Sequence, residues 1–502
     1  EMQSKLTAAR TSKTPVIIAS QAEAEKREAS KSKDFKTWVF EAKNVRDFAW
    51  ASSRKFIWDA MGVPSEGKTV MCMSLYPKEG NPLWEKFSTH AVAQTIITYS
   101  KHTIQYPYPV AISVNGPIGG MEYPMICFNG PRPEADGTYS ENTKIGLISV
   151  VIHEVGHNFF PMIINSDERQ WTWMDEGFNT FVQYLTEKEW DKDYPSRRGE
   201  PRYIVNYMAS DKSTLTPIMS NSESILQFGN NAYGKPATAL NILRETVMGR
   251  ELFDFAFKTY CQRWAFKHPR PADFFRTMED ASAVDLDWFW RGWFYGIEPC
   301  DISIDEVAWY KIDTKNPEEE KKFKKELQND IPESISKQRD KTAIPITRVM
   351  NYPEIKDFYN TYDPFKATDY EKSNYQQYLG TLSEEEKKLL NADKNIYWIT
   401  FENVGGLIMP LILEFEYIDG TKEVKRIPAE IWRLNNSKVS KTFITDKPIK
   451  QISLDPYQET ADIDLENNFY PQKEVPSKLQ LFKEKQREKE KNLMQLQKEG
   501  KL

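Results

Sequence analysis

The chain is poor in cysteine and histidine and has no long apolar run. It holds 4 cysteines and 5 histidines among 502 residues. The cysteines lie far apart and form no CxxC pair: Cys72, Cys127, Cys261 and Cys300. This spacing excludes a disulfide framework and a thiolate zinc site, so we expect buried free thiols. No uncharged apolar run approaches the roughly 20 residues that cross a bilayer, which excludes a membrane-spanning helix.

An excess of basic residues is also absent. The formal net charge is −6, whereas a nucleic-acid binder normally carries a basic excess, so we exclude nucleic acid as a partner. Hydrophobic residues make up 40% of the chain and aromatic residues 13%, which is enough for packed interiors and argues against disorder. A chain of 502 residues is too long for one hydrophobic core, so roughly two to four domains are expected.

Residues 1–60 are predicted to be the remnant of an N-terminal β-domain. The short apolar run "PVIIAS" (Pro15–Ser20) predicts a strand, and the alternation in "TWVFEAKNVRDFAW" (Thr37–Trp50) predicts a hairpin. A strand and a hairpin are too little for a stable domain. The sequence begins with Glu1 and no signal peptide precedes it, so we expect a processed form or a fragment.

Residues 61–310 are predicted to form a mainly helical domain with a small upstream sheet. Their apolar residues recur at helical spacing or in short strand-like runs. The expected helices cover residues 84–102, 143–160 and 173–190, and the expected strands cover 108–116 and 125–130. Pro161 ends the second of these helices, because proline removes a hydrogen-bond donor from the helical ladder.

The composition changes after residue 310. Residues 311–395 are rich in charge and are predicted to be a helical insertion or a linker, because such runs are normally solvated. Residues 396–472 alternate apolar and polar positions around Asp419 and Gly420, a strong hairpin signal, and are predicted to form an antiparallel β-sandwich. Residues 473–502 mix lysine and glutamate with scattered leucine and are predicted to be a charged helical tail.

Two of the 5 histidines lie four residues apart in "HEVGH" (His153–His157). Residues at this spacing share one face of a helix, so the two imidazoles can bind one metal ion. Glu154 projects about 100° round the helix, where it can reach a metal-bound water without being a ligand. Catalytic zinc takes three protein ligands and keeps one position open. Glu176, which eighteen intervening residues separate from His157, lies on the next predicted helix and is the expected third ligand.

These residues could instead be ordinary helix positions. The histidines, however, follow the apolar run "LISVVI" (Leu147–Ile152), where an unpaired imidazole is costly to bury. The HExxH pattern with a downstream glutamate is typical of zinc hydrolases. We therefore predict one Zn²⁺ per chain, bound by His153, His157 and Glu176.

Further side chains are expected to orient the two imidazoles. Metal-bound histidines normally donate their second N–H to a carboxylate or a carbonyl group. Asp175 and Thr180 are the candidates, and Thr180 is the better placed along its helix. The other three histidines show no ligand spacing and are expected to be structural or exposed: His90, His102 and His268.

Three motifs together resemble the aminopeptidase N family of gluzincin metallopeptidases, which includes the leukotriene hydrolases. The first is "HEVGH" with the glutamate of "WMDEGFNTF" (Trp173–Phe181). The others are "GPIGGMEYPM" (Gly116–Met125), which resembles the family's GxMEN motif, and "AYGKPATAL" (Ala232–Leu240), which resembles its YxKG segment. Their order and spacing fit the family over roughly residues 36–300. The predicted β-sandwich is similar to the small C-terminal domain of bacterial members.

This resemblance implies a zinc-dependent aminopeptidase, built as a multidomain α+β protein with a thermolysin-like catalytic domain. Glu154 would be the general base for a zinc-activated water, and Tyr233 would stabilise the oxyanion. The substrate-binding residues would be Gly119, Gly120, Met121 and Glu122, with Glu122 on the free α-ammonium. The implied partner is a peptide with a free N-terminus. Similarity to exported bacterial enzymes favours the periplasm or cell surface over the cytoplasm.

The sequence departs from the family pattern at three places. Tyr123 replaces the asparagine of GxMEN, Pro236 replaces the glycine of YxKG, and most of the family's N-terminal β-saddle is missing. A zinc endopeptidase or another zinc hydrolase, such as an epoxide hydrolase of the leukotriene type, is therefore an alternative. A weakly catalytic module that binds peptide or glycan is another. The sequence determines neither the preferred first residue of the substrate nor the oligomeric state.

Overall fold

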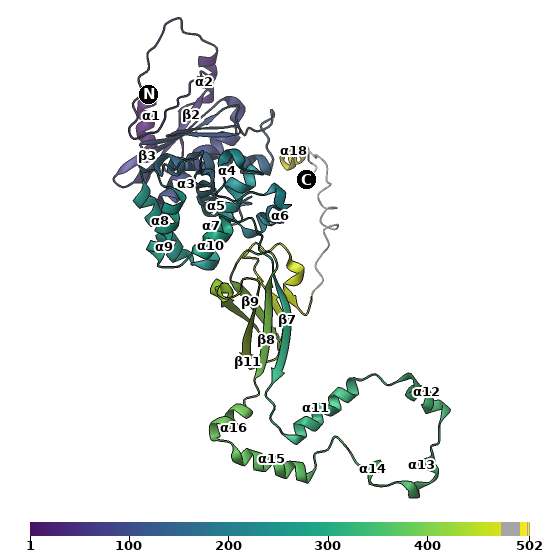
Figure 1. Cartoon of the computed structure of the whole chain (residues 1–502). Coiled ribbons are helices and arrows are strands. Elements are labelled where there is room, and N and C mark those ends of the chain that lie inside the picture. The colour runs from purple at the N-terminus through teal and green to yellow at the C-terminus, as the bar shows by residue number, and fades with distance from the viewer. Residues whose placement is uncertain (473–491, 499, 501–502) are drawn as a thin grey trace.

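The computed structural model describes residues 1–472, 492–498 and 500, and within them it is a mixed α and β structure with three sheets (Figure 1). A six-stranded sheet lies near the N-terminus and packs on a group of helices. A β-domain made of two sheets follows, and a string of helices extends from its far end. Most of the charged helical tail expected over residues 473–502 lies outside the described residues, and α18 (Leu493–Lys498) is the helix described there.

The six-stranded sheet has the strand order β1-β2-β3-β4-β6-β5. The strands are β1 (Val16–Ala19), β2 (Ile57–Ser65), β3 (Lys68–Tyr76), β4 (Val110–Asn115), β5 (Gly120–Tyr123) and β6 (Ile126–Asn129). Strand β4 runs parallel to β3 and β6, whereas β5 pairs antiparallel with β6 and forms one edge. The segment that resembles GxMEN therefore lies on an edge strand. At the other edge β1 pairs with β2, so residues before 60 share this sheet.

Helices pack against the sheet and against one another. The central ones are α3 (Leu83–His102), α4 (Glu141–Gly156), α5 (Phe178–Trp190), α7 (Lys235–Ile242), α8 (Arg250–Trp264), α9 (Pro271–Ser282) and α10 (Asp287–Trp293). The same part of the chain also holds α1 (Met2–Ala9), α2 (Gln21–Glu28) and α6 (Val205–Met208). Helix α3 contacts β2, β3 and β4 as well as α4 and α5, so it joins the sheet to the helices that carry the metal-binding motif.

The helix predicted over residues 143–160 is shorter at its C-terminal end. Ser140 caps the start of α4, where its Oγ accepts a hydrogen bond from the Thr143 N–H at 3.1 Å. The α-helix ends at Gly156, and a π-helical turn, η2 (Asn158–Ile163), follows. Phe160 within this turn has extended backbone angles (φ −130°, ψ 113°), because the residue before Pro161 disfavours the helical region.

A second π-helical turn, η3 (Trp173–Gly177), runs directly into α5. A third, η7 (Gly229–Gly234), leads into α7. The chain therefore turns back after η2, and the two predicted zinc-binding helices pack on each other as α4 and α5.

The hairpin predicted over Thr37–Trp50 is not formed. Among the described residues, no strand lies between β1 and β2. The large side chains of this segment are exposed, including Trp38, Val39 and Phe40. An alternating pattern makes a sheet only where neighbouring strands bury one of its faces, and no strand pairs with this segment in the described part of the chain.

Two antiparallel sheets make up the β-domain, with the orders β10-β9-β12-β13 and β11-β8-β7. The strands are β7 (Ile302–Lys311), β8 (Asn395–Asn403), β9 (Leu411–Tyr417), β10 (Lys422–Ile427), β11 (Lys438–Thr445), β12 (Ile449–Leu454) and β13 (Phe469–Tyr470). The Phe415 ring on β9 lies 5.1 Å from the Phe443 ring on β11, so the two sheets share a core. Strand β7, which precedes the predicted boundary at residue 310, pairs with β8 in this domain.

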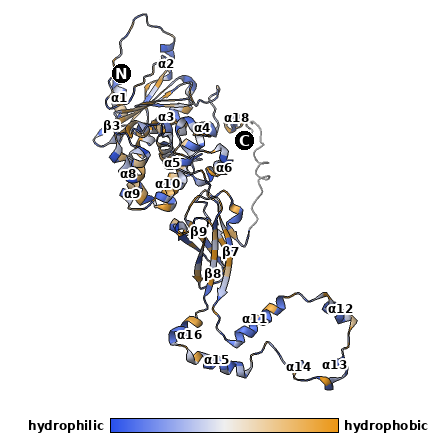
Figure 2. Cartoon of the chain, in the orientation of Figure 1, coloured by the Kyte–Doolittle hydropathy of each residue, from blue (hydrophilic) through white to orange (hydrophobic). Residues whose placement is uncertain are grey.

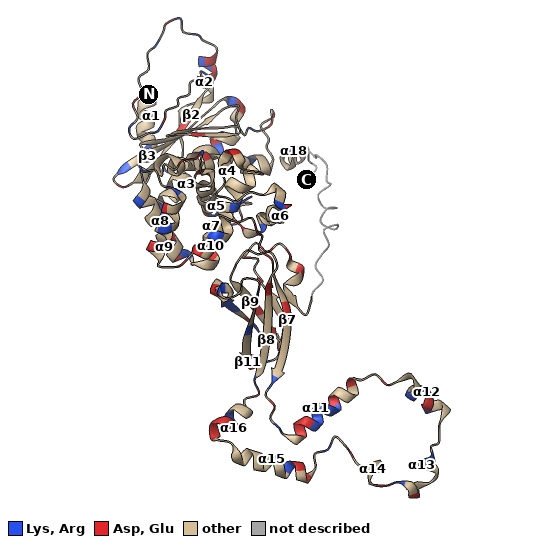
Figure 3. Ribbon diagram, viewed as in Figure 1, with Lys and Arg blue, Asp and Glu red and all other residues tan. Residues whose placement is uncertain are grey.

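The charge-rich segment leaves the β-domain between β7 and β8 as a series of helices (Figures 2 and 3). They are α11 (Pro317–Asp330), α12 (Ile335–Ala343), α13 (Arg348–Asn351), α14 (Phe358–Thr361), α15 (Asp369–Thr381) and α16 (Glu384–Leu390). Ion pairs join α11 to α15, at 3.2 Å between Lys321 and Glu371 and 2.8 Å between Lys372 and Glu318. Most side chains here are exposed, as expected of a solvated charge run.

In the described part of the chain, no helix combines the length and the apolar character that a membrane crossing requires.

Replacing Trp173 tests the packing that holds η3. This side chain is 1% exposed, and its ring lies 4.8 Å from Phe294 and 5.2 Å from Phe178. We expect Trp173→Ala to lower the free energy of unfolding by about 3–5 kcal/mol, because it leaves a cavity among buried rings. Urea unfolding followed by circular dichroism measures the change. Trp38→Ala, at a side chain that is 75% exposed, should change it by about 0.5 kcal/mol or less, and equal effects would contradict this view of the core.

Candidate metal centre

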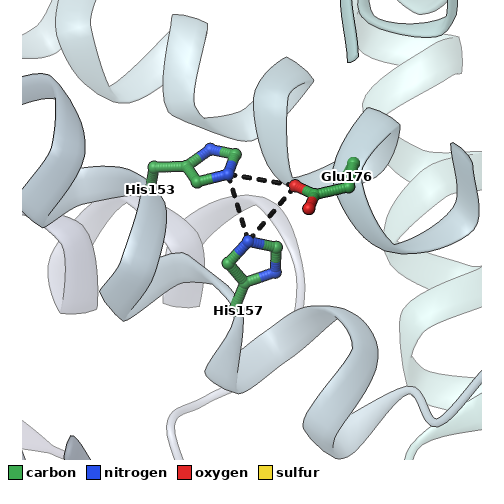
Figure 4. Close-up of side chains that lie close together, drawn as sticks. All are labelled: His153, His157 and Glu176. Atoms are coloured by element: carbon green, nitrogen blue, oxygen red, sulfur yellow. Dashed lines mark hydrogen bonds and ion pairs between the residues drawn. The ribbon is translucent and has the colours of Figure 1, made fainter. Parts of the chain in front are cut away.

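Three ligand atoms from separate elements converge in the helical domain (Figure 4). His153 lies in α4, His157 follows its last residue, and Glu176 lies in η3. The Nε2 atoms of the two imidazoles are 3.1 Å apart. Glu176 Oε2 lies 3.1 Å from His153 Nε2 and 3.3 Å from His157 Nε2. The three side chains that the sequence predicts as ligands therefore meet at one point.

The outer nitrogen of each imidazole contacts a hydrogen-bond acceptor. His153 Nδ1 lies 2.9 Å from Gln183 Oε1. His157 Nδ1 lies 2.9 Å from the Phe160 carbonyl oxygen and 2.8 Å from Asp175 Oδ1. These acceptors assign the ring proton to Nδ1 in both histidines, so each Nε2 presents a lone pair to the centre.

This donor set fits a divalent cation such as zinc. Two imidazole lone pairs and a carboxylate oxygen repel one another at 3.1–3.3 Å unless a positive charge lies between them. Ligands about 2.1 Å from a tetrahedral zinc ion lie roughly 3.4 Å from each other, close to the distances observed. A glutamate with two histidines is also an established ligand set for catalytic zinc.

Of the two side chains expected to orient the histidines, Asp175 contacts one of them and Thr180 does not. Thr180 was the favoured candidate, but its Oγ1 is buried and makes no hydrogen bond with the described residues. Asp175 contacts His157 and Gln183 contacts His153 instead. Sequence reasoning missed Gln183, although it lies seven residues after Glu176 and so on the same helical face.

Glu154 is buried beside the centre, with 6% of its surface exposed. A Cβ atom added to Gly120 would overlap its carboxylate, so β5 passes directly over this side chain. Burial raises the pKa of Glu154 against the lowering effect of His157, and together with the carboxylates of Glu122 and Glu176 it brings this pKa to about 8. Its Oε2 makes no hydrogen bond among the described residues, which leaves it free to accept one from a ligand.

Burial and the two imidazoles act in opposite directions on Glu176. Burial raises the pKa of this carboxyl, but the histidines beside it outweigh burial, and the net pKa lies below the usual range. Glu176 therefore stays ionised, as a metal ligand must.

Tyr233, in η7, lies against two of the predicted ligands. Its hydroxyl donates a hydrogen bond of 2.6 Å to Glu176 Oε1, and its ring stacks on His153 at 5.7 Å between centroids. Burial and the nearby Glu176 raise the pKa of Tyr233, so the phenol keeps its proton. On the far side of the ring, the guanidinium carbon of Arg198 lies 4.5 Å from the ring centroid. Sequence reasoning did not single out Arg198.

Glu122 lies at the centre but is not one of the three predicted ligands. Ligand atoms of Glu122, His157 and Asp175 all lie within 4.8 Å of one another. Because the Asp175 carboxylate lies 2.8 Å from His157 Nδ1, the nitrogen that faces away from the centre, this second group is better suited to orient His157 than to bind a second metal. Glu122 thus offers a carboxylate next to the metal centre. Gly119, Gly120 and Met121 precede it at the start of β5.

Comparisons with known proteins agree with this geometry. Residues 87–293 match the Peptidase family M1 domain. "Probable aminopeptidase 1" of Sulfurisphaera tokodaii is 24% identical over 239 residues, which cover 44% of this chain and 30% of that protein. "Aminopeptidase M1-A" of Oryza sativa subsp. japonica is 20% identical over 233 residues, which cover 44% of this chain and 26% of that protein. The chain therefore spans less than a third of the length of each relative.

A solved structure resembles the chain over a longer stretch. The crystal structure of Legionella pneumophila aminopeptidase A in complex with aspartic acid matches 81% of this chain and 38% of that one. The TM-score is 0.51 and the sequence identity 9%, so the likeness is one of fold. The match of residues 87–293 to the Peptidase family M1 domain and the similarity to aminopeptidases confirm the resemblance to the aminopeptidase N family of zinc metallopeptidases.

Proposed function

We propose that this chain hydrolyses peptide bonds with one zinc ion held by His153, His157 and Glu176, and that it removes N-terminal residues from peptides. The observation that supports this proposal is the convergence of three lone-pair donors at one point. The Nδ1 atom of each histidine is already hydrogen-bonded, so each Nε2 faces the centre. Zinc, when bound, acts as a Lewis acid that acidifies water and polarises a carbonyl group. The remaining roles belong to side chains of the protein.

Glu154 acts as the general base. Its buried carboxylate accepts the proton of the attacking water at a free Oε2 and returns that proton to the leaving amine. Burial raises the pKa of Glu154, and a raised pKa makes its carboxylate a stronger base.

Tyr233 stabilises the negative charge that develops on the carbonyl oxygen. A donor serves this role only while it is protonated, and the raised pKa of Tyr233 keeps the phenol protonated. Its hydrogen bond to Glu176 holds the hydroxyl at the edge of the metal centre.

Glu122 binds the α-ammonium group of the substrate. Its carboxylate lies close to His157 and Asp175, so the N-terminus of the peptide would rest beside the metal centre. The unpaired side of edge strand β5 offers backbone groups to an extended peptide, and Gly119 and Gly120 allow a close approach. An enzyme that binds the substrate's N-terminus next to the metal acts as an aminopeptidase, whereas an endopeptidase does not require a free N-terminus.

Replacing Glu154 separates chemistry from metal binding. Glu154→Gln should retain one zinc per chain and lower kcat by about 10²- to 10⁴-fold, because the amide cannot accept the proton. Elemental analysis and hydrolysis of aminoacyl amides measure the two properties. Glu141→Gln, at an exposed position in the first turn of the same helix, should leave both unchanged. Full activity of Glu154→Gln would rule out the assigned base.

Removing the phenolic hydroxyl tests Tyr233. We expect Tyr233→Phe to lower kcat by about 10²- to 10³-fold with little change in KM, because the hydrogen bond matters mainly in the transition state. Steady-state kinetics on an aminoacyl amide give both constants. Tyr203→Phe, at an exposed tyrosine of the same domain, is the matched control. A change confined to KM would argue against the oxyanion role.

Neutralising Glu122 tests recognition of the free N-terminus. The wild-type protein should cleave a free peptide at least about tenfold faster than its N-acetylated form, because only the free amine pairs with the carboxylate. Glu122→Gln should bring the two rates together by slowing the free peptide. Values of kcat/KM for the free and the acetylated peptide, measured with both proteins, test this role of Glu122. Rapid cleavage of the acetylated peptide by the wild-type protein would instead favour an endopeptidase.

A further inference from the structure

A cavity of about 530 Å³ opens beside the metal centre. Its walls come from one face of α4, Gly120 of β5, one face of α5, the loop that follows α5, and Tyr233. The volume falls in the range of roughly 300–1,000 Å³ that is usual for ligand pockets. Among the described residues that line it, Glu154 is present and Glu122 is not. The cavity therefore extends away from the carboxylate assigned to the peptide's N-terminus, and it fits the residues that follow the scissile bond.

Three charged side chains line this cavity in addition to Glu154. Among the described residues, only the acidic one of the three, Glu187, has hydrogen-bond partners. The Glu187 carboxylate accepts hydrogen bonds from Ser149 Oγ at 2.7 Å and Gln183 Nε2 at 2.8 Å. Arg197 and Arg198 line the cavity as well, and Arg197 is exposed. The two arginines in the cavity are therefore less well paired than Glu187.

Arg198 is the distinctive group. It is half-buried, and within the described part of the chain its guanidinium makes neither an ion pair nor a hydrogen bond. The guanidinium lies over the face of the Tyr233 ring. Burial lowers the pKa of Arg198, but arginine's ordinary pKa is so high that the group stays charged. A buried cation without a carboxylate is costly, and a guanidinium has five N–H donors that match a carboxylate in a two-pronged geometry.

We propose that Arg198 is a specificity-determining residue that binds a carboxylate of the peptide on the C-terminal side of the scissile bond. This inference rests on the proposed peptidase function. The carboxylate has two possible sources, an acidic side chain on the residue after the scissile bond or the free C-terminus of a dipeptide. The position of Arg198 next to Tyr233 places the bound carboxylate close to the reacting bond.

Four dipeptide substrates distinguish these sources. They are alanyl-glutamate amide, alanyl-glutamine amide, alanyl-lysine amide and alanyl-glutamine with a free C-terminus. For the wild-type enzyme we expect kcat/KM for at least one carboxylate-bearing substrate to exceed that of alanyl-glutamine amide by roughly 10- to 100-fold. The lysine substrate should be the slowest. A preference for lysine, or equal values for all four, would overturn the proposal.

Substitution at Arg198 then tests the residue itself. Arg198→Gln should bring the ratio of carboxylate-bearing to neutral substrate close to one, and Arg198→Lys should restore part of it. Arg202→Gln, at an exposed arginine outside the cavity, should keep the wild-type ratio. If Arg198→Gln instead slows all substrates equally and keeps the ratio, then Arg198 only positions Tyr233 and the proposal fails.

Binding provides a readout that does not depend on turnover. Calorimetry on zinc-loaded Glu154→Gln protein should show the preferred carboxylate-bearing dipeptide binding at least about tenfold more tightly than alanyl-glutamine amide. Adding Arg198→Gln should remove this difference. Absence of hydrolysis by the wild-type enzyme would contradict the peptidase function while leaving this measurement valid. Equal binding of the two dipeptides to the Arg198-containing protein would overturn the role of Arg198 alone.

Discussion

The metal centre depends on one constraint: three lone pairs must lie close together. They repel one another when no cation is present. The ligand atoms lie only 3.1–3.3 Å apart in His153, His157 and Glu176, because other groups contact each side chain on the side away from the centre. Gln183 and Asp175 fix the two rings through Nδ1, so neither imidazole can turn its lone pair away. These outer contacts form when the protein folds, and they hold the ligands in place for a metal ion.

Close packing gives the surrounding elements little freedom to shift. A Cβ atom at Gly120 would overlap the Glu154 carboxylate, and one at Gly156 would overlap the side chains of Tyr99 and Asn179. Edge strand β5 and helices α3 and α5 therefore approach α4 more closely than larger residues would permit. The same approach that places β5 over Glu154 also brings this edge strand, on which an extended peptide could pair, to the metal centre.

Charge is distributed unevenly around the centre. Glu122, Glu154, Asp175 and Glu176 all lie near His157, where a metal ion and a substrate ammonium group would supply compensating positive charge. The adjoining cavity contains the Arg198 guanidinium, which forms no ion pair with any described residue. A peptide lying across the centre would therefore meet carboxylates at its N-terminus and a cation beyond the scissile bond, and this polarity orients the chain.

The sequence by itself determined the pair of imidazoles and the glutamate between them, because the period of a helix is a local property that places residues i and i+4 on one face. Only the tertiary structure decided which residues surround that pair. Asp175 rather than Thr180 contacts His157, and Gln183 contacts His153. These contacts depend on how the turns η2 and η3 lead α5 back against α4, and such packing brings together residues whose separation along the chain carries no periodic signal.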